Sequence, residues 1–306
     1  MAFVDGPVVV EVPATSANLG PGYDCLGLAL ELRDRLTASV ADALRIEVDG
    51  EGADEVPRDD SHLVLRSVRA GLEFLGEELP GLALHCENRI PHSRGLGSSS
   101  AAIVGGLALA RALVAGGADR MDDGVLLEIA NRIEGHPDNV APAVRGGFVV
   151  CGQTRAESGV EVWAEGARVA PAIGAVVFVS PEGVRTDVAR GLLPAEVAHA
   201  DAAANSGRAA LLVAALAGAP ERLHRATEDF LHQRFREPAM PASYAFVQDL
   251  RADGVPAVIS GAGPTVLAFT APGLTGADDL LARVPEGWRA EALDVATEGV
   301  RVSAAD

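Results

Sequence analysis

The sequence predicts an α+β fold. Three observations support this prediction: short apolar runs are typical of strands, longer segments carry apolar residues at helical spacing, and Gly-rich turns separate the segments. With 306 residues, of which 48% are hydrophobic, the chain is long enough to bury a core in each of two domains, or in one large one.

Strands are expected where a short apolar run is bounded by turn residues. Such runs lie at 8–12, 36–40, 44–48, 82–87, 147–151, 175–179, 257–260 and 266–270. The last two flank the Gly-rich turn that contains Gly261, Gly263 and Thr265. This turn is therefore expected to join two strands.

Helices are expected where apolar residues recur every three or four positions. Segment 61–75 shows this pattern most clearly, with Ser61 as its expected N-cap. The other expected helices lie at 103–115, 124–133, 208–216, 220–231, 244–252 and 276–283, and 116–123 is expected to be a loop. The predicted domain boundary falls at 171–174, which divides the chain into domains 1–172 and 173–306.

Composition excludes several classes of function. The net charge of −18 argues against a nucleic-acid partner, because such a protein must neutralise phosphates with a basic surface. All 25 basic residues are arginine, so a P-loop ATPase and a protein kinase, which need a lysine at the phosphates, are excluded.

The compartment is expected to be the cytoplasm. No apolar run has the length of a membrane span, and the start of the chain lacks the pattern of a secretory signal. Three scattered cysteines, Cys25, Cys86 and Cys151, favour neither a disulfide framework nor a zinc site. No membrane partner is expected.

A Gly/Ser-rich segment stands immediately before the small-residue helix expected at 103–115. Glycines let the backbone approach a ligand, and the free amides at a helix start bind anions such as phosphate. Taken alone, the segment could also be a turn that caps a core helix. The candidate ATP-binding residues are Pro91, His92, Ser93, Arg94, Gly95, Leu96, Gly97, Ser98, Ser99, Ser100 and Ala101.

Three further segments accompany this loop: 13–30, which contains Asn18-Leu19-Gly20-Pro21-Gly22-Tyr23-Asp24, then 134–142, and 259–268. Together, and in this order, the four motifs resemble those of the GHMP kinase superfamily. The sequences of segments 13–30 and 134–142 resemble the homoserine kinase family within it. The resemblance extends from about residue 10 to about residue 268. It implies an N-terminal domain like that of ribosomal protein S5, a C-terminal ferredoxin-like domain, and an active cleft between them.

The resemblance implies ATP and Mg²⁺ as cofactors. One Ser of the phosphate loop and one Glu of the helix before 134–142 hold the metal in the family, which points to Ser99 and Glu134 here. Oxygen ligands of this kind suit Mg²⁺. Glu128 lies on the same expected helix and stays an alternative to Glu134.

The resemblance also implies a pocket for an amino alcohol, L-homoserine. Its ammonium group needs a carboxylate and its carboxylate needs the fork of an arginine. The candidate substrate-binding residues are Asn18, Asp24, His136, Asn139, Arg190 and Arg236. Without the resemblance, Asp24 could equally cap the next element, Asn18 could be a turn residue, and each arginine could be a solvated surface group.

The reaction implied is transfer of the γ-phosphoryl group of ATP to the hydroxyl of L-homoserine, with no dedicated catalytic base. The loose transition state of phosphoryl transfer depends mainly on positioning and charge stabilisation. Two alternatives stay open: a GHMP kinase for another alcohol, and a non-catalytic homologue that regulates a partner. A homodimer is possible. Tyr23 and His62 depart from the Phe and Asn usual in the family, and His62 lies near the expected site of the adenine base.

Overall fold

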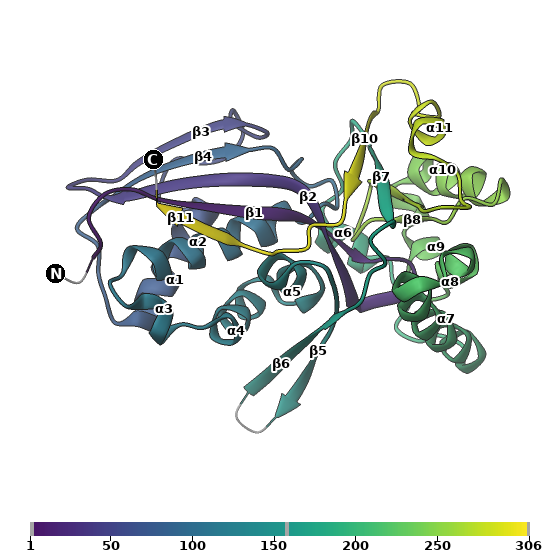
Figure 1. The fold of residues 1–306 in the computed structure, drawn as a ribbon, viewed down its shortest axis with the longest axis horizontal. Helices are drawn as coiled ribbons and strands as arrows, with labels where there is room; N and C mark the ends of the chain where they lie inside the picture. The colour runs from purple at the N-terminus through teal and green to yellow at the C-terminus, as the bar shows by residue number, and fades with distance from the viewer. Residues whose placement is uncertain (1–2, 157–158, 305–306) are drawn as a thin grey trace.

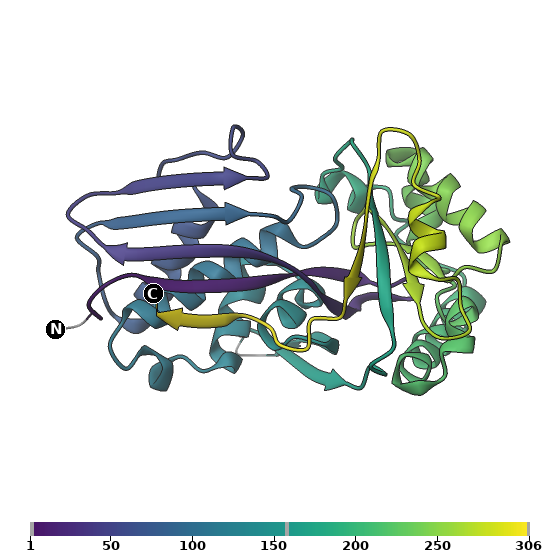
Figure 2. The same cartoon turned by 45° about the horizontal axis from the view of Figure 1, so that its top comes forward.

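The computed structural model describes residues 3–156 and 159–304, and it confirms the α+β prediction. Its larger sheet has seven strands and its smaller sheet has four. Figures 1 and 2 show the two sheets at opposite ends of an elongated molecule, each with helices packed against it.

The larger sheet has the strand order β11-β1-β2-β4-β3, and a hairpin of β5 and β6 is attached to β2. Figure 2 shows its strands side by side. The first two strands form one long hairpin whose tip reaches the other half of the molecule (Figure 1). The strands are β1 (Val8–Asn18), β2 (Gly22–Val40), β3 (Arg45–Gly50), β4 (Leu82–Asn88), β5 (Phe148–Ala156), β6 (Gly159–Ala167) and β11 (Arg301–Ala304).

Helices cover one face of this sheet: α1 (Leu63–Leu75), α2 (Ser98–Leu113), α3 (Gly117–Arg120), α4 (Asp123–Glu134) and α5 (Pro137–Arg145). The close packing of α1 on α2 explains the small-residue run that the sequence shows in α2. A Cβ atom on Gly106 would lie 2.5 Å from the carbonyl oxygen of Val64 and 2.6 Å from the Cβ of Ser67. Only glycine allows this approach.

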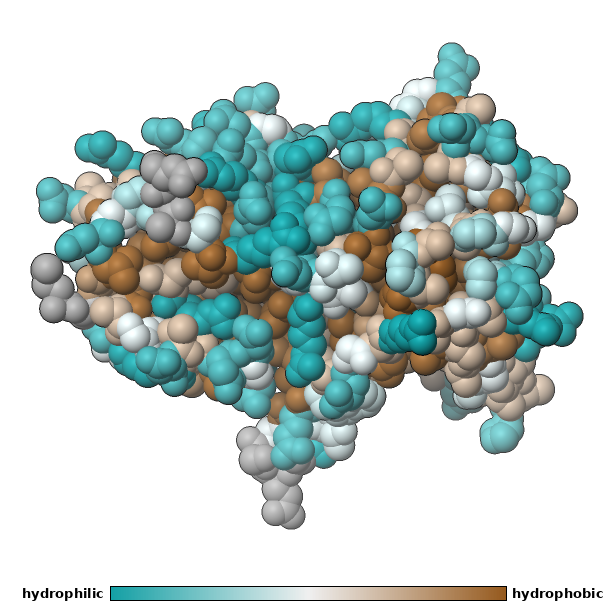
Figure 3. Space-filling model, in the orientation of Figure 1, coloured by the Kyte–Doolittle hydropathy of each residue, from teal (hydrophilic) through white to brown (hydrophobic). Residues whose placement is uncertain are grey.

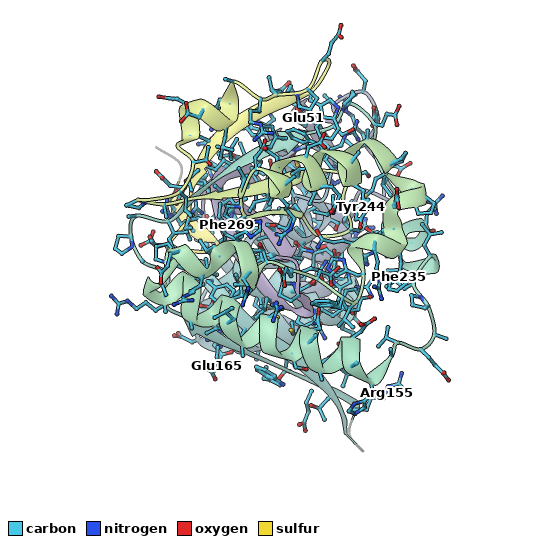
Figure 4. All side chains as sticks on the ribbon, turned by 90° about the vertical axis from the view of Figure 1, so that its right-hand side faces the viewer. Glu51, Arg155, Glu165, Phe235, Tyr244 and Phe269 are labelled. Atoms are coloured by element: carbon cyan, nitrogen blue, oxygen red, sulfur yellow. The ribbon has the colours of Figure 1, made fainter. Side chains whose placement is uncertain are left out.

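The smaller sheet has the order β10-β7-β9-β8 with antiparallel neighbours, which is the βαββαβ arrangement of a ferredoxin-like fold. Its strands are β7 (Gly174–Val179), β8 (Ala257–Ile259), β9 (Val266–Thr270) and β10 (Arg289–Asp294). The helices of this half are α6 (Thr186–Gly191), α7 (His199–Gly218), η1 (Pro220–Arg222), α8 (Leu223–Ala226), α9 (Gln233–Arg236), η2 (Glu237–Ala239), α10 (Pro241–Ala252) and α11 (Ala277–Leu281). Figure 4 looks onto this helical layer, with α7 in front and Phe235 and Tyr244 at one side.

The end of the chain returns to the larger sheet. Val10 of β1 pairs with Val302 of β11, so the last strand completes a sheet that begins with the first strand. The division at residue 172 stays a prediction, and the pairing places β11 with the first half of the chain rather than with the second.

Several expected elements differ in the structure. Ser61 is not the N-cap of α1: the helix begins at Leu63, His62 precedes it, and the Ser61 hydroxyl instead bonds Asp59 at 2.6 Å. The expected loop 116–123 contains the short helix α3. The helix expected at 220–231 ends at Ala226, because the Asp229 carboxylate accepts hydrogen bonds from the backbone amides of three later residues and so holds a turn.

Other elements are absent from the prediction. They are β6, β10, β11, α5, α6 and α9. The alternation of Val160, Val162 and Ala164 is a strand signal that could have found β6. In β10 most side chains are exposed or polar, so no apolar run marks it.

The face shown in Figure 3 carries hydrophilic side chains along its upper edge, above β3 and β4. Across residues 3–156 and 159–304, no helix combines the length and the apolar character needed to cross a membrane.

A buried carboxylate on β2 should make stability depend on pH. Asp34 is 5% exposed and accepts hydrogen bonds from the amides of Arg89 (2.6 Å) and Ile90 (2.9 Å), yet burial raises the pKa of this carboxyl from 3.8 to about 6. A pKa raised by folding means that stability is full below the unfolded value and decreases as the pH rises through the folded value. The free energy of unfolding should therefore fall as the pH rises from about 4 to about 6, and the loss due to Asp34 should persist at higher pH.

We expect Asp34→Asn to stabilise the protein at pH 7.5 by up to about 3 kcal/mol, because the amide oxygen can keep both hydrogen bonds while the buried charge is removed. The gain should vanish near pH 4, which denaturant titration at the two pH values would measure. Asp42→Asn, at an exposed position, is the control and should change little. An Asp34→Asn protein that is less stable than the wild type at pH 7.5 would contradict the argument.

Candidate functional site

The four sequence motifs meet around one hollow between the two halves of the molecule. Its volume is about 180 Å³. Residues from every motif line it, together with residues in and just before α6 and one residue of α9. The lining residues are Asn18, Ser93, Gly95, Gly97, Ser98, Ser99, Glu134, His136, Asp138, Asn139, Val184, Thr186, Arg190, Arg236, Gly261, Ala262 and Gly263. A larger groove of about 980 Å³ lies between α1 and the start of β4, but none of these residues lines it. The smaller hollow is therefore the candidate active site.

The phosphate loop ends in the N-terminus of α2, as the sequence predicts. Gly97 caps this helix at φ 72°, and Ser98 and Ser99 begin it. A Cβ on Gly97 would clash with the hydroxyl of Thr15, so the loop passes very close to β1. The free amides of the first helical turn face the hollow side and suit an anion.

Not every residue of the loop faces the hollow. Leu96 is buried in the core, and Ser100 and Ala101 are buried within α2. The Arg94 guanidinium points away, toward the carbonyl oxygens of Ser180 (3.0 Å), Pro181 (2.7 Å) and His92 (2.9 Å). These contacts tie the loop to the segment before α6, while Ser93, Gly95, Gly97, Ser98 and Ser99 line the hollow.

The two predicted metal ligands lie together. The Ser99 hydroxyl donates to the Glu134 carboxylate at 2.7 Å, and the Ser100 hydroxyl bonds the same oxygen at 3.0 Å. Glu134 is the last residue of α4, and Gly135 ends that helix in the left-handed conformation. Glu128 instead lines a separate hollow with Gln153 and Arg155.

These residues fit a magnesium ion that shares its ligands with a nucleotide. A hydroxyl and a carboxylate oxygen are ligands that Mg²⁺ prefers, and Mg²⁺ usually takes only one or two carboxylates plus phosphates and water. In the described part of the chain, no group of three or more His, Cys, Asp and Glu side chains is placed to hold a metal. The site supplies only part of a coordination shell, as expected for an ion that arrives with ATP.

Arg190 lines the same hollow and forms an ion pair with Asp24, which does not line it. Asp24 has φ 55°, and its carboxylate accepts two hydrogen bonds from Arg190, at 2.6 and 3.1 Å. Arg190 also donates to the Tyr23 hydroxyl at 2.8 Å, so the residue that departs from the family's usual Phe has a partner. A carboxylate and a guanidinium held side by side can receive the ammonium and the carboxylate of an amino acid.

Arg236 is not a surface arginine. Its side chain is 1% exposed, donates to the carbonyl oxygen of Gly261 at 3.1 Å, and lies over the Tyr23 ring with 5.5 Å to its centroid. Burial lowers the pKa of this guanidinium, although the nearby Tyr23 and Asp24 oppose the effect. The Tyr23 ring also lies 5.6 Å from Arg190, so both arginines contact one aromatic ring.

Two further predicted residues, His136 and Asn139, are held by neighbours. Asp138 is buried and accepts a hydrogen bond from His136 Nδ1 at 2.7 Å. Burial lowers the pKa of His136, but the hydrogen bond and charge of Asp138 outweigh it, so the net pKa is raised. Asn139 accepts from the Thr15 hydroxyl at 2.8 Å. These contacts fix His136 and Asn139 at the edge of the hollow.

Asn18 uses both ends of its amide inside the protein. Its Nδ2 donates to the carbonyl oxygen of Gly261 at 2.9 Å, and its Oδ1 accepts from the amide of Asp24 at 2.9 Å. The residue thus joins the first motif to the last Gly-rich loop. Its contact with substrate stays a prediction.

A second hollow, of about 240 Å³, adjoins the phosphate loop and shares Ser98 and Ser99 with the first. His62, which stands where the family usually has Asn, lines it and is 5% exposed. Its Nδ1 atom lacks a hydrogen-bond partner within the described residues. This atom is itself buried, so the contact of His62 with a base in the hollow stays a prediction.

The sequence did not single out Thr15, His232 or Ser260. The Ser260 hydroxyl donates to the carbonyl oxygen of Gly95 at 2.6 Å and thereby joins the last loop to the phosphate loop. Each of these side chains supports another residue, so its role depends on partners distant in sequence. In the sequence, the short spacing of Asp229, His232 and Arg236 is the one pattern that could have indicated that His232 contacts Arg236.

Comparisons with known proteins agree with this geometry. The family described as GHMP kinases N terminal domain matches residues 62–147. A homoserine kinase of Streptomyces avermitilis is 53% identical over 98% of this chain and 97% of its own length. One of Streptomyces coelicolor is 53% identical over 98% and 96%.

Solved structures give the same result. A homoserine kinase from Cytophaga hutchinsonii superposes with a TM-score of 0.81 at 26% identity and covers 99% of both chains. A mevalonate diphosphate decarboxylase from Staphylococcus aureus, at 14% identity, covers 97% of this chain and 98% of its own with a TM-score of 0.66, and shares the fold alone. Full-length similarity to the curated relatives, together with the four motifs around one hollow, places this chain in the homoserine kinase family of the GHMP kinases.

Proposed function

We propose that this chain is an ATP:L-homoserine O-phosphotransferase that produces O-phospho-L-homoserine for threonine biosynthesis. The observation that carries the proposal is the convergence of two unlike groups of residues on one hollow. The first group, the α2 N-terminus with Ser99 and Glu134, suits a nucleotide phosphate. The second, Arg190 and Arg236 on the hollow with Asp24 paired to Arg190 behind them, suits a zwitterionic amino acid.

On the nucleotide side, the amides of the phosphate loop and of the first turn of α2 would bind the phosphates. Ser99 and Glu134 would hold a magnesium ion, which supplies neutralisation of phosphate charge when bound. The hollow lined by His62 would take the base. These roles use only groups that already lie beside one another.

On the substrate side, homoserine would insert between Asp24 and Arg190, with its ammonium group on the carboxylate and its own carboxylate on the guanidinium. Arg236, which lies 5.5 Å from the centroid of the Tyr23 ring and also lines the hollow, would bind the same carboxylate. His136 and Asn139 would orient the hydroxyl end. Fixed positions of this kind lower the entropic part of the barrier.

We propose no dedicated base. Asp138 is the carboxylate comparable to the base of other GHMP kinases, and it accepts a hydrogen bond from His136. A carboxylate accepts but does not donate, so His136 Nδ1 carries the hydrogen and Asp138 orients the ring. In a loose transition state the hydroxyl can lose its proton late.

One assay tests the function. ADP release is measured with ATP and Mg²⁺ against a panel of L-homoserine, mevalonate, galactose and L-threonine, and the product is identified by ³¹P NMR. We expect turnover with L-homoserine at least about 100-fold above the others. Mevalonate and galactose lack the ammonium group that Asp24 would bind, and L-threonine carries its hydroxyl on the β-carbon, one carbon closer to the charged groups than in homoserine. Preference for mevalonate would favour another GHMP kinase activity, and ATP binding without turnover would favour a regulatory homologue. Cytoplasmic location and a homodimer stay predictions, the second testable by light scattering.

A further inference from the structure

His232 lies completely buried between the first sequence motif and Arg236. It follows the turn that Asp229 holds, and its side chain is 0% exposed. Its ring stacks at a tilt against Tyr23, with 5.4 Å between centroids. It does not line the candidate active site, so it acts on a substrate only through another residue.

Both ring nitrogens of His232 are engaged, and their partners fix the tautomer. Nε2 lies 2.7 Å from the carbonyl oxygen of Gly20, which only accepts, so Nε2 carries the hydrogen. Nδ1 lies 3.2 Å from Nη1 of Arg236, which only donates, so Nδ1 is the acceptor. A neutral imidazole with its hydrogen on Nε2 satisfies both contacts, and the protonated ring cannot.

The surroundings of the ring favour the neutral form. Burial lowers the pKa of His232, the nearby Arg236 cation acts in the same direction, and Asp229 opposes it. The Asp229 carboxylate already accepts from the amides of Leu231, His232 and Gln233. These three hydrogen bonds stabilise the negative charge of Asp229 and so weaken its tendency to favour a proton on the His232 ring.

Arg236 depends on this contact for its position. Its Nη1 is held by His232 and by the carbonyl oxygen of Gly261, whereas its Nε is buried without a hydrogen-bond partner among the described residues. The Gly20 carbonyl on the other side of the ring belongs to the turn that carries Asn18 and Asp24. One imidazole thus connects this turn to the neighbouring Arg236.

We propose that His232, as the neutral Nε2–H tautomer, is a positioning residue that fixes Arg236 relative to the Asp24 turn and thereby sets the distance between the sites for the two charged groups of the substrate. The proposal rests on the proposed function for the identity of the substrate. It does not involve the phosphate loop, so nucleotide binding should not depend on His232.

The kinetic test uses His232→Gln, which keeps a donor and an acceptor but not the fixed spacing of the two ring nitrogens. We expect KM for L-homoserine to rise about tenfold and KM for ATP to change less than about twofold, as for loss of a hydrogen bond to a charged group. His224→Gln is the matched control, since His224 also bonds a backbone carbonyl, that of Arg251 at 3.0 Å, whereas the histidine that contacts Arg236 is His232. The control should keep both KM values.

Two further measurements separate positioning from general destabilisation. In a cycle with Arg236→Lys, the two changes should raise KM for homoserine by clearly less than the product of their separate effects, because both act through one guanidinium. In wild-type protein, the ¹⁵N spectrum of His232, assigned through scalar couplings to its own backbone, should show Nδ1 without a proton at pH 7.

The proposal is overturned by an unchanged homoserine KM in His232→Gln, by multiplicative effects in the cycle, or by a proton on Nδ1. The spectrum needs no substrate, so it tests the tautomer even if the variant does not fold. Wild-type protein that fails to phosphorylate homoserine would instead reject the proposed function, which keeps the two failures distinct.

Discussion

Replacing Glu134 by glutamine should lower kcat at least about 100-fold, because the change removes a charged magnesium ligand that a site with few protein ligands cannot replace. Glutamine preserves the side-chain size and can still accept from Ser99 and Ser100, which contact this carboxylate at 2.7 and 3.0 Å. The Mg²⁺ concentration for half-maximal activity should rise as well. Steady-state ADP release over a Mg²⁺ series measures both effects.

Glu128→Gln is the matched control for this result. The residue lies on the same helix and the change is identical, but Glu128 is exposed and lines a different hollow with Arg132 and Gln153. Its kcat should stay within about twofold of wild type, as for a surface substitution away from the site. Near-normal turnover of Glu134→Gln together with loss in Glu128→Gln would show that the other carboxylate binds the metal.

The second large effect concerns Asp24. We expect Asp24→Asn to raise KM for L-homoserine more than tenfold and to leave KM for ATP nearly unchanged, since a charge-assisted hydrogen bond contributes about 1.5–3 kcal/mol. The change also removes the partner of Arg190, whose two contacts with this carboxylate measure 2.6 and 3.1 Å. Initial rates at varied homoserine and at varied ATP separate the two KM values.

Asp187→Asn provides the comparison. Asp187 lies on the same helix as Arg190 and forms an equally short ion pair, at 2.6 Å, with Arg185. The side chains of Asp187 and Arg185 are both exposed. Exposed pairs contribute little, so both KM values should stay near those of the wild type. If Asp24→Asn raised KM for ATP and spared homoserine, Asp24 would belong to the nucleotide side of the site.

The sequence predicted the elements whose formation depends on near neighbours. The phosphate loop at the start of α2 follows from Gly97 and the serines after it, and α1 follows from apolar residues at helical spacing. The resemblance pointed to Ser99 and Glu134, whose side chains lie in contact at 2.7 Å. Their role as metal ligands, and the choice of Glu134 over Glu128, stays a prediction. The predicted N-cap of α1 was wrong, because the Ser61 hydroxyl bonds Asp59 outside the helix and does not cap it.

The order of the strands could not be read from the sequence. The pairing of β11 with β1 joins the two ends of the chain, and nothing local marks residues 301–304 as a partner for residues 8–11. The β10 strand carries too few buried apolar residues to be recognised. Strands of this kind form because a neighbouring strand offers hydrogen bonds, which is a property of the folded sheet.

Residue types, motif order and charge by themselves therefore determined the superfamily, the phosphate loop and most of the residues that line the hollow. Tertiary structure alone decided how those residues are used. It pairs Asp24 with Arg190 across 166 positions and buries Arg236 against Tyr23 and His232. The physical reason is range: caps, turns and helical faces depend on residues a few positions apart, whereas a long-range ion pair or a buried arginine depends on which distant groups packing brings into contact.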